Sequence, residues 1–169
     1  MRPDRSSVSG CLNGGFVGEA SNSVFRACTA ALELRDSKAT SAGGAAAVTF
    51  GSTAFYDCSA TVDAAVPIGR IGGFVGWTVG AETFSNCTAT LTATATPVIN
   101  YDAGTTNIYS LTTGGFAASV ASDGALFVDC TAASSGGGDL KAGFYYNQAP
   151  YSQNVAVGSN TFRRCHAVD

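Results

Sequence analysis

Phe84-Ser-Asn-Cys87-Thr88-Ala89 is one of five copies of the phrase that decides the fold of this 169-residue chain. Each copy has a Phe, two variable residues, a Cys, one polar residue and an Ala. The other copies are Phe25-Arg-Ala-Cys28-Thr29-Ala30, Phe55-Tyr-Asp-Cys58-Ser59-Ala60, Phe127-Val-Asp-Cys130-Thr131-Ala132 and Phe162-Arg-Arg-Cys165-His166-Ala167. A phrase that recurs about every 30 residues predicts a stacked repeat, in which each unit buries its apolar edge against its neighbours.

A glycine phrase precedes each copy. The five phrases are Gly14-Gly15-Phe16-Val17, Gly43-Gly44-Ala45-Ala46, Gly72-Gly73-Phe74-Val75, Gly114-Gly115-Phe116-Ala117 and the degenerate Ala142-Gly143-Phe144-Tyr145. Paired glycines predict a tight corner that opens a strand, where the backbone needs either a positive φ or very close packing.

The residues after each Cys alternate between apolar and polar. Cys87, Ala89 and Leu91 alternate with threonines, and this period of two predicts a strand whose buried face carries the Cys. The Phe lies three residues before the Cys, which is the wrong parity for one straight strand. We therefore predict a bend or bulge between them that lets both side chains point inward. The predicted core ladder is Phe25, Phe55, Phe84, Phe127 and Phe162, with Cys28, Cys58, Cys87, Cys130 and Cys165.

Two strands per unit, recurring in the same order, can pair in parallel only if the chain winds. The sequence therefore predicts an all-β, single-domain parallel β-helix of about five coils, in which like residues stack at ~4.8 Å. Right-handed winding is expected from the general preference of parallel crossovers. No window has a helical stripe with caps, so we expect no helix. A β-sandwich is the alternative, although its strands would not share a fixed period.

Residues 1–7 are predicted to form a polar tail and residues 8–169 the solenoid. The longer spacings from Cys87 to Cys130 and from Cys130 to Cys165 predict insertion loops at 97–111 and 145–158. Val8-Ser-Gly-Cys11 resembles the tail of a preceding unit, and no apolar leader follows the first charges. We expect a mature segment or a piece of a longer protein.

The composition restricts the partners. Charged residues make up 12% of the chain, against roughly 25% in ordinary domains, and the net charge is −3. A surface with so little charge favours self-association and offers no basic stripe to nucleic acid. Residues 83–101 and 103–122 carry no charge, but their Thr, Ser and Gly alternate as strands do. We expect no membrane span.

The cysteines are not spaced as zinc ligands, because no Cys-x-x-Cys occurs. Stacking would bring them into one column. Three roles remain open for them: buried thiols that act as small hydrophobes, disulfides between neighbouring rungs, and a metal or redox role.

The residues before each Cys are Ala27, Asp57, Asn86, Asp129 and Arg164. This column contains too few acidic ligands for a calcium ladder, so we interpret it as a polar edge. Asn86-Cys87-Thr88 is a formal glycosylation acceptor, and we place it within a strand, where poor use is expected.

Parallel β-helices that cleave polysaccharides cluster Asp, His, Arg or Lys on one outer face. This chain has one His, His166, and no acidic pair recurs at one position. We therefore expect no enzymatic activity, no catalytic residue, no cofactor and no metal.

Aromatic residues give the strongest indication of binding. Most of the tyrosines lie in the predicted insertions among amide side chains, a mixture typical of protein contacts and sugar recognition. The candidate binding residues are Tyr101, Tyr109, Tyr145, Tyr146, Tyr151 and Asn147. The alternative is that these rings cover the wall of the solenoid. Trp77 is expected to pack against a coil or loop.

One unit of the chain resembles the bacterial GLUG repeat of secreted and surface proteins. The resemblance is carried by Gly72-Gly-Phe-Val-Gly76 followed by Phe84-Ser-Asn-Cys-Thr-Ala-Thr90. The pairing of the glycine and Phe phrases is also similar to the repeats of chlamydial polymorphic outer-membrane proteins, with Cys where that family has Asn. The resemblance covers residues 8–169. It implies a β-solenoid from an extracellular assembly or a cell-surface adhesin, and it supplies no catalytic residue.

Together these observations favour a structural, non-enzymatic repeat protein of an extracellular filament, appendage or surface assembly. Its expected partners are copies of itself, which would associate through the solenoid ends or loops. The alternative is an adhesin-type module that recognises a glycan or a surface protein through the tyrosine-rich loops.

Overall fold

The computed structural model describes residues 11–35, 39–65, 70–93, 112–135, 141–142, 144 and 159–168. These residues form strands and corners, and no helix occurs among them. The expectation of an all-β chain is confirmed for this part of the sequence.

The strands form four sheets, here called sheets A to D, and every strand pair is parallel. Sheet A contains β1 (Cys11–Gly14), β5 (Ala39–Gly43), β9 (Arg70–Gly72), β13 (Thr112–Gly114) and β17 (Lys141–Ala142), in that order. Sheet B contains β2 (Val17–Ser21), β6 (Ala46–Gly51), β10 (Val75–Gly80) and β14 (Ala117–Val120). Sheet C contains β3 (Val24–Arg26), β7 (Ala54–Tyr56), β11 (Thr83–Ser85), β15 (Leu126–Val128) and β18 (Thr161–Arg163). Sheet D contains β4 (Thr29–Leu34), β8 (Ser59–Ala64), β12 (Thr88–Ala93), β16 (Thr131–Ser135) and β19 (His166–Val168).

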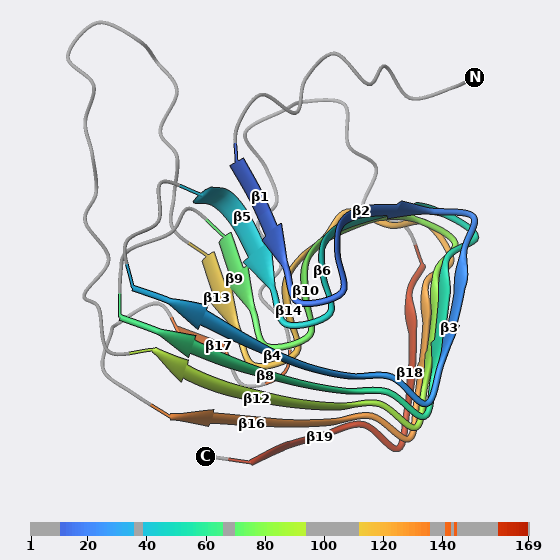
Figure 1. Ribbon diagram of the computed structural model, residues 1–169. Coiled ribbons are helices and arrows are strands. Elements are labelled where there is room, and N and C mark those ends of the chain that lie inside the picture. The colour runs from blue at the N-terminus through green and yellow to red at the C-terminus, as the bar shows by residue number, and fades with distance from the viewer. Residues whose placement is uncertain are drawn as a thin grey trace, which may run out of the picture.

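The chain visits the sheets in the order A, B, C, D and then begins again (Figure 1). We call the described parts of the five passes units 1 to 5: 11–35, 39–65, 70–93, 112–135, and 141–142, 144 and 159–168. Each described strand pairs only with strands of adjacent units. Parallel sheets built in this way are consistent with a parallel β-solenoid.

The prediction of two strands per unit is wrong, because units 1 to 4 have four strands each. Three corners divide each unit. The paired glycines separate sheet A from sheet B, a second corner separates B from C, and the residue before the Cys separates C from D. Two residues separate the strands at most of these corners, and the longest described corner, between β14 and β15, has the five residues 121–125. Each straight segment is therefore short.

Like residues lie on like residues along the stack. In sheet C, Phe84 pairs with Phe55 on one side and Phe127 on the other. In sheet D, Ala89 lies between Ala60 and Ala132. The predicted stacking of Phe on Phe and Ala on Ala is confirmed in both sheets.

The bend between Phe and Cys is confirmed as well. The residue before each Cys has a left-handed backbone, with φ between 49° and 55°. In the middle units this one residue reverses the side-chain parity, so that Phe84 and Cys87 are both buried at 0% and 1% exposure. Figure 1 shows the resulting sharp corner between β11 and β12 and at the equivalent places above and below it.

The paired glycines form a corner that reaches toward the middle of sheet D (Figure 1). A Cβ on Gly44 would lie 2.3 Å from the carbonyl oxygen of Gly73 and 2.7 Å from the Cβ of Ala60. Among the described glycines, a positive φ occurs at Gly51, Gly80 and Gly124, none of which belongs to a pair. Close approach, rather than a positive φ, is therefore the reason for the paired glycines.

This corner divides the interior into two compartments. The larger one, between sheets B, C and D, contains the Phe and Cys columns and the phrase alanines Ala60, Ala89 and Ala132. The smaller one, between sheets A and D, holds Leu34, Ala42, Val62, Ala64, Ile71 and Leu91. Each fully buried Phe or Leu side chain contributes about 1.5–3 kcal/mol of hydrophobic stabilisation.

No helix in the described part of the chain is long and apolar enough to span a bilayer.

Candidate functional site

The predicted binding residues lie outside the described residues: Tyr101, Tyr109, Tyr145, Tyr146, Tyr151 and Asn147. The structure therefore says nothing of the geometry of the tyrosine-rich loops. The alternative function, recognition of a glycan or a protein, is therefore supported by the sequence alone.

The residues of the predicted core ladder form two neighbouring columns in the larger compartment. Phe55, Phe84 and Phe127 have no exposed surface, and their rings stack with centroids 4.8–5.5 Å apart. Phe25 and Phe162 continue the column at its two ends, where they are partly buried. The column is complete through all five units.

The cysteines show the same gradient from the middle to the ends. Cys58, Cys87 and Cys130 are buried, whereas Cys28 and Cys165 are half-buried, and all five are free thiols. The side chain of Cys11 lies outside the described set. Each of the five thiols donates to the carbonyl oxygen two residues before it, for example Cys58 Sγ to Tyr56 O at 3.1 Å.

The surroundings of three of these thiols, Cys58, Cys130 and Cys165, favour the protonated form. Burial raises the pKa of Cys58 and of Cys165. The pKa of Cys130 is raised by its side-chain interaction with Cys87 and then by burial. Since the thiolate is the nucleophile and the metal ligand, the raised pKa values make Cys58, Cys130 and Cys165 less reactive at neutral pH than an ordinary cysteine.

The polar edge before the Cys has a structural role that the sequence interpretation missed. Its residues are exposed and form the left-handed corner, and Asp and Asn tolerate that backbone better than most residues do. Asn86 Nδ2 donates to Asp57 Oδ1 at 2.7 Å, and Arg164 Nη2 donates to Asp129 Oδ2 at 2.7 Å. The preference of Asp and Asn for positive φ was the available signal. Asn86 is therefore in an exposed corner, and our placement of the glycosylation acceptor within a strand is wrong.

Ala27 is poorly suited to this corner, because it lacks the short polar side chain with which Asp and Asn tolerate a left-handed backbone, and its φ is 49°. We expect Ala27→Asn to raise the free energy of unfolding by about 0.5–1 kcal/mol, a part of the usual left-handed penalty. Urea unfolding followed by circular dichroism measures it. The control is Ala31→Asn, an exposed strand position in β4 with ordinary backbone, where a small loss is expected. Equal effects at both positions would contradict the corner argument.

A second column, polar in four of its five members, lies at the corner between sheets B and C. Its members lie two residues before each Phe: Ser23, Thr53, Glu82, Ala125 and Asn160. Most of them bind the backbone of the corner. Thr53 Oγ1 donates to Phe50 O at 2.8 Å, and Asn160 Oδ1 accepts from the amide of Ala125 at 3.0 Å.

Glu82 is the exceptional member, since its side chain is completely buried. Its Oε1 accepts from the amide of Val79 at 2.9 Å and from Thr49 Oγ1 at 3.4 Å. Its Oε2 accepts from Ser122 Oγ at 2.8 Å, and Ser122 in turn lies 2.7 Å from Thr78 Oγ1. Sequence reasoning missed this cluster, because the carboxylate occurs in one unit and therefore gives no periodic signal.

Burial raises the pKa of Glu82, and the three hydrogen bonds offset this effect in part. The unfolded chain therefore loses its proton at a lower pH than the folded chain. The contribution of Glu82 to stability is complete below the ordinary glutamate pKa and is lost as the pH rises through the raised one.

We expect Glu82→Gln to remove this pH dependence. The amide preserves the shape, and the Ser122 hydroxyl can turn to accept from it. The difference in Tm between the variant and the parent should grow in favour of the variant from about pH 4 to pH 8. Thermal unfolding at several pH values measures it, and a difference that stays constant with pH would contradict the assignment.

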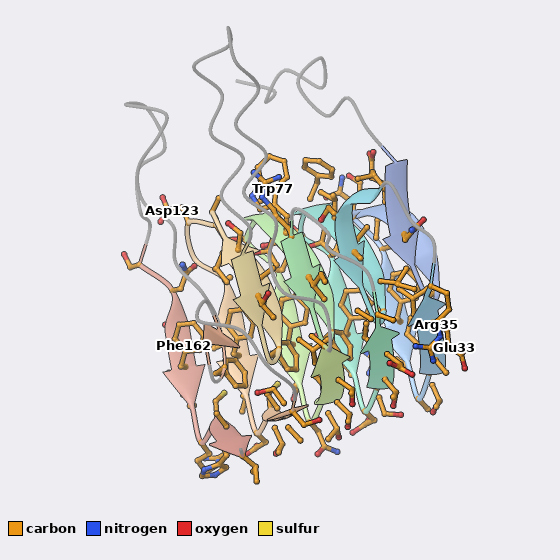
Figure 2. The ribbon with its side chains drawn as sticks, turned by 90° about the vertical axis from the view of Figure 1, so that its left-hand side faces the viewer. Glu33, Arg35, Trp77, Asp123 and Phe162 are labelled. Carbon is orange, nitrogen blue, oxygen red and sulfur yellow. The ribbon has the colours of Figure 1, made fainter. Side chains whose placement is uncertain are left out.

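The outer side of sheets A and B carries a small aromatic cluster. Trp77 meets Phe50 edge to face at 6.4 Å between ring centroids, and the guanidinium of Arg70 lies 4.9 Å from the Trp77 ring. Trp77 is thus partly covered by residues of its own and the adjacent unit, as Figure 2 shows at the upper rim of the stack. Within the described ranges, no group of three or more His, Cys, Asp or Glu side chains could hold a metal ion.

The two ends of the stack are the remaining candidate surfaces. At one end lie the edge strands β1, β2, β3 and β4, and at the other lie β17, β18 and β19. Within the described residues, each of these strands pairs on one side only, and its other side carries the backbone groups that interior strands use for pairing. In Figure 2, Phe162 marks one end, and Glu33 and Arg35 mark the other.

Comparisons of the chain with protein-family models, with curated proteins and with solved structures give no match. The function of the chain is therefore inferred from its sequence and its geometry.

Proposed function

We propose that the chain is a structural, non-enzymatic building block of an extracellular filament, appendage or surface assembly. In this proposal the units are coils of a right-handed β-solenoid of about five coils, and copies of the chain associate with one another through the solenoid ends or loops. Right-handed winding agrees with the general preference of parallel crossovers.

The observation that carries the proposal is the repetition of one parallel pairing pattern from unit 1 to unit 5, with edge strands at both ends of the described stack. A strand edge is a template for another strand. The low charge of the chain, 12% of its residues, leaves little electrostatic repulsion between copies.

The chemistry of the interior also supports a structural role. All five Phe-phrase cysteines are buried or half-buried, and the pKa values of Cys58, Cys130 and Cys165 are raised, so that these three thiols are weakened as nucleophiles. The residues that repeat from unit to unit are the ones that pack, namely Phe, Cys, Ala and paired Gly.

Light scattering and negative-stain electron microscopy of the purified chain over a range of concentrations test the proposal. We expect mass to increase with concentration and elongated particles to form. A chain that remains monomeric at every concentration would contradict the proposed function. The handedness and the number of coils are tested separately by an experimental density map.

A further inference from the structure

The backbone hydrogen bonds between units run in a fixed direction along sheet D. The amide of the first residue of each strand donates to the carbonyl oxygen of the Cys in the preceding unit. The bonds are Ser59 N to Cys28 O at 2.8 Å, and Thr88 N to Cys58 O, Thr131 N to Cys87 O and His166 N to Cys130 O, each at 2.9 Å. In unit 1 the amide of Thr29 has the position of these donors, and in unit 5 the carbonyl of Cys165 has the position of these acceptors. No further described unit lies beside either group.

The corner residues bond in the opposite direction. The bonds are Ala27 N to Tyr56 O and Asp57 N to Ser85 O at 3.0 Å, and Asn86 N to Val128 O and Asp129 N to Arg163 O at 2.9 Å. At the ends, the amide of Arg164 and the carbonyl of Arg26 are the corresponding groups. Each end thus offers one donor where the other end offers the matching acceptor.

We infer that a second copy of this chain stacks head to tail, with its unit 1 placed on unit 5 in the register that the units keep among themselves. Strand β18 of one copy then lies beside β3 of the next, and β19 lies beside β4. This inference depends on the proposed function, because it names the surface through which copies associate. We call this contact the seam.

Side chains at the two ends continue the interior columns across the seam. Phe162 comes to lie on Phe25, and the column of rings, spaced 4.7–5.5 Å within the chain, continues from one copy to the next. Both rings are partly buried in the single chain, as are Cys28 and Cys165. A unit from another copy covers all four.

The exposed apolar residues agree with this contact. Among the described residues, Val24 and Val168 are the large hydrophobic residues that are exposed, at 61% and 53%. One is at each end of the stack. In the inferred register Val24 adjoins Thr161, and Val168 adjoins Ala31, so that each gains a neighbour on its open side.

One pair at the seam opposes association. One row of sheet C, in which each residue pairs with the next, consists of Arg26, Tyr56, Ser85, Val128 and Arg163. Stacking therefore places Arg163 of one copy beside Arg26 of the next. Both are exposed, so their repulsion is modest and is screened by salt. Association should accordingly strengthen as the salt concentration rises.

This like-charge pair provides a test that is specific for the register. Arg163→Glu should strengthen association roughly two- to fivefold, the range for an exposed ion pair, and should reverse the salt dependence. Arg26→Glu alone should act in the same direction. The double variant restores like charges, so its association constant should return toward that of the parent. Such non-additivity is the signature of direct contact between the two residues.

A second measurement needs no variant. Alkylation of Cys28 and Cys165, followed by peptide mass spectrometry, should slow at both positions together as the concentration rises. Denaturant should expose every cysteine equally.

The outcomes separate the two proposals. A chain that never associates contradicts both the proposed function and the seam. Association with additive charge effects, or with both thiols still reactive, contradicts the seam and leaves the proposed function standing. Protection of one thiol without the other indicates pairing of two like ends and also contradicts the head-to-tail register. Non-additive charge effects with joint protection of both thiols support the inference.

Discussion

Gly44→Ala is expected to lower the free energy of unfolding by about 3–5 kcal/mol, although it adds a single methyl group. The new Cβ would lie 2.3 Å from the carbonyl oxygen of Gly73 and 2.7 Å from the Cβ of Ala60. Real Cβ contacts are not this short. The carbonyl belongs to the backbone of the adjacent unit, so it cannot turn away as a flexible side chain can.

To relieve these short contacts of the new Cβ, the glycine corner would have to move away from sheet D. Because the corner separates the two core compartments, its withdrawal would loosen Phe and Cys packing on one side and Leu and Val packing on the other. The same corner recurs in adjacent units, where a Cβ on Gly73 would lie 2.1 Å from the carbonyl oxygen of Gly115. A shift in one unit therefore strains the next.

The control for this prediction is Gly18→Ala in β2. A Cβ there meets its nearest neighbour, the carbonyl oxygen of Leu12, at 3.3 Å. We expect a change within about 1 kcal/mol, since Ala also restricts the unfolded chain. Urea unfolding by circular dichroism compares the two variants. If Gly44→Ala proves as stable as Gly18→Ala, the close approach of the corner to sheet D is wrong.

The strands and their stacking could be predicted from the sequence because they are local features repeated five times. Alternation around Cys87 indicates which face is buried, and the odd spacing from Phe84 requires a bend. The repeat then indicates that Phe84 lies on Phe55. Each of these inferences needs only the residues of one unit and the period.

The corner near sheet D could not be predicted, because it depends on distances between residues far apart in the unit. Gly44 and Ala60 touch only after sheets B and C have turned the chain back. The predicted number of strands per unit is wrong for the same reason. Paired glycines indicate that the backbone closely approaches another part of the chain, but they do not indicate which part.

Glu82 was missed for a different reason. A functional carboxylate can be recognised in a repeat sequence when it recurs at one position or when several share an outer face. A single carboxylate that points inward gives neither signal, and its partners Thr49 and Ser122 come from the adjacent units. The Asp and Asn residues before the Cys did recur, and they were interpreted by their charge rather than by their backbone preference.

Phe84→Ala is the second large effect that we expect, with a loss of about 3–5 kcal/mol in the free energy of unfolding. The Phe84 ring has no exposed surface. It stacks on Phe55 and Phe127 at 5.5 and 4.8 Å, and it meets Phe74 and Phe116 edge to face at 5.9 and 5.6 Å. Removal of the ring leaves a void that four aromatic neighbours, fixed by their own strands, cannot fill.

The matched control is Phe25→Ala, which removes the same ring from the same column at the end of the stack. Phe25 is partly buried and stacks on Phe55 at 4.7 Å and on Phe16 at 6.2 Å. Solvent can enter part of the space that it leaves, so the loss should be less than half of that for Phe84→Ala. Unfolding of both variants is compared in urea at a concentration where the chain is monomeric. Equal losses at the two positions would mean that the end unit is covered as completely as the middle one. That result would contradict the partial exposure of the end rings, on which the proposed seam depends.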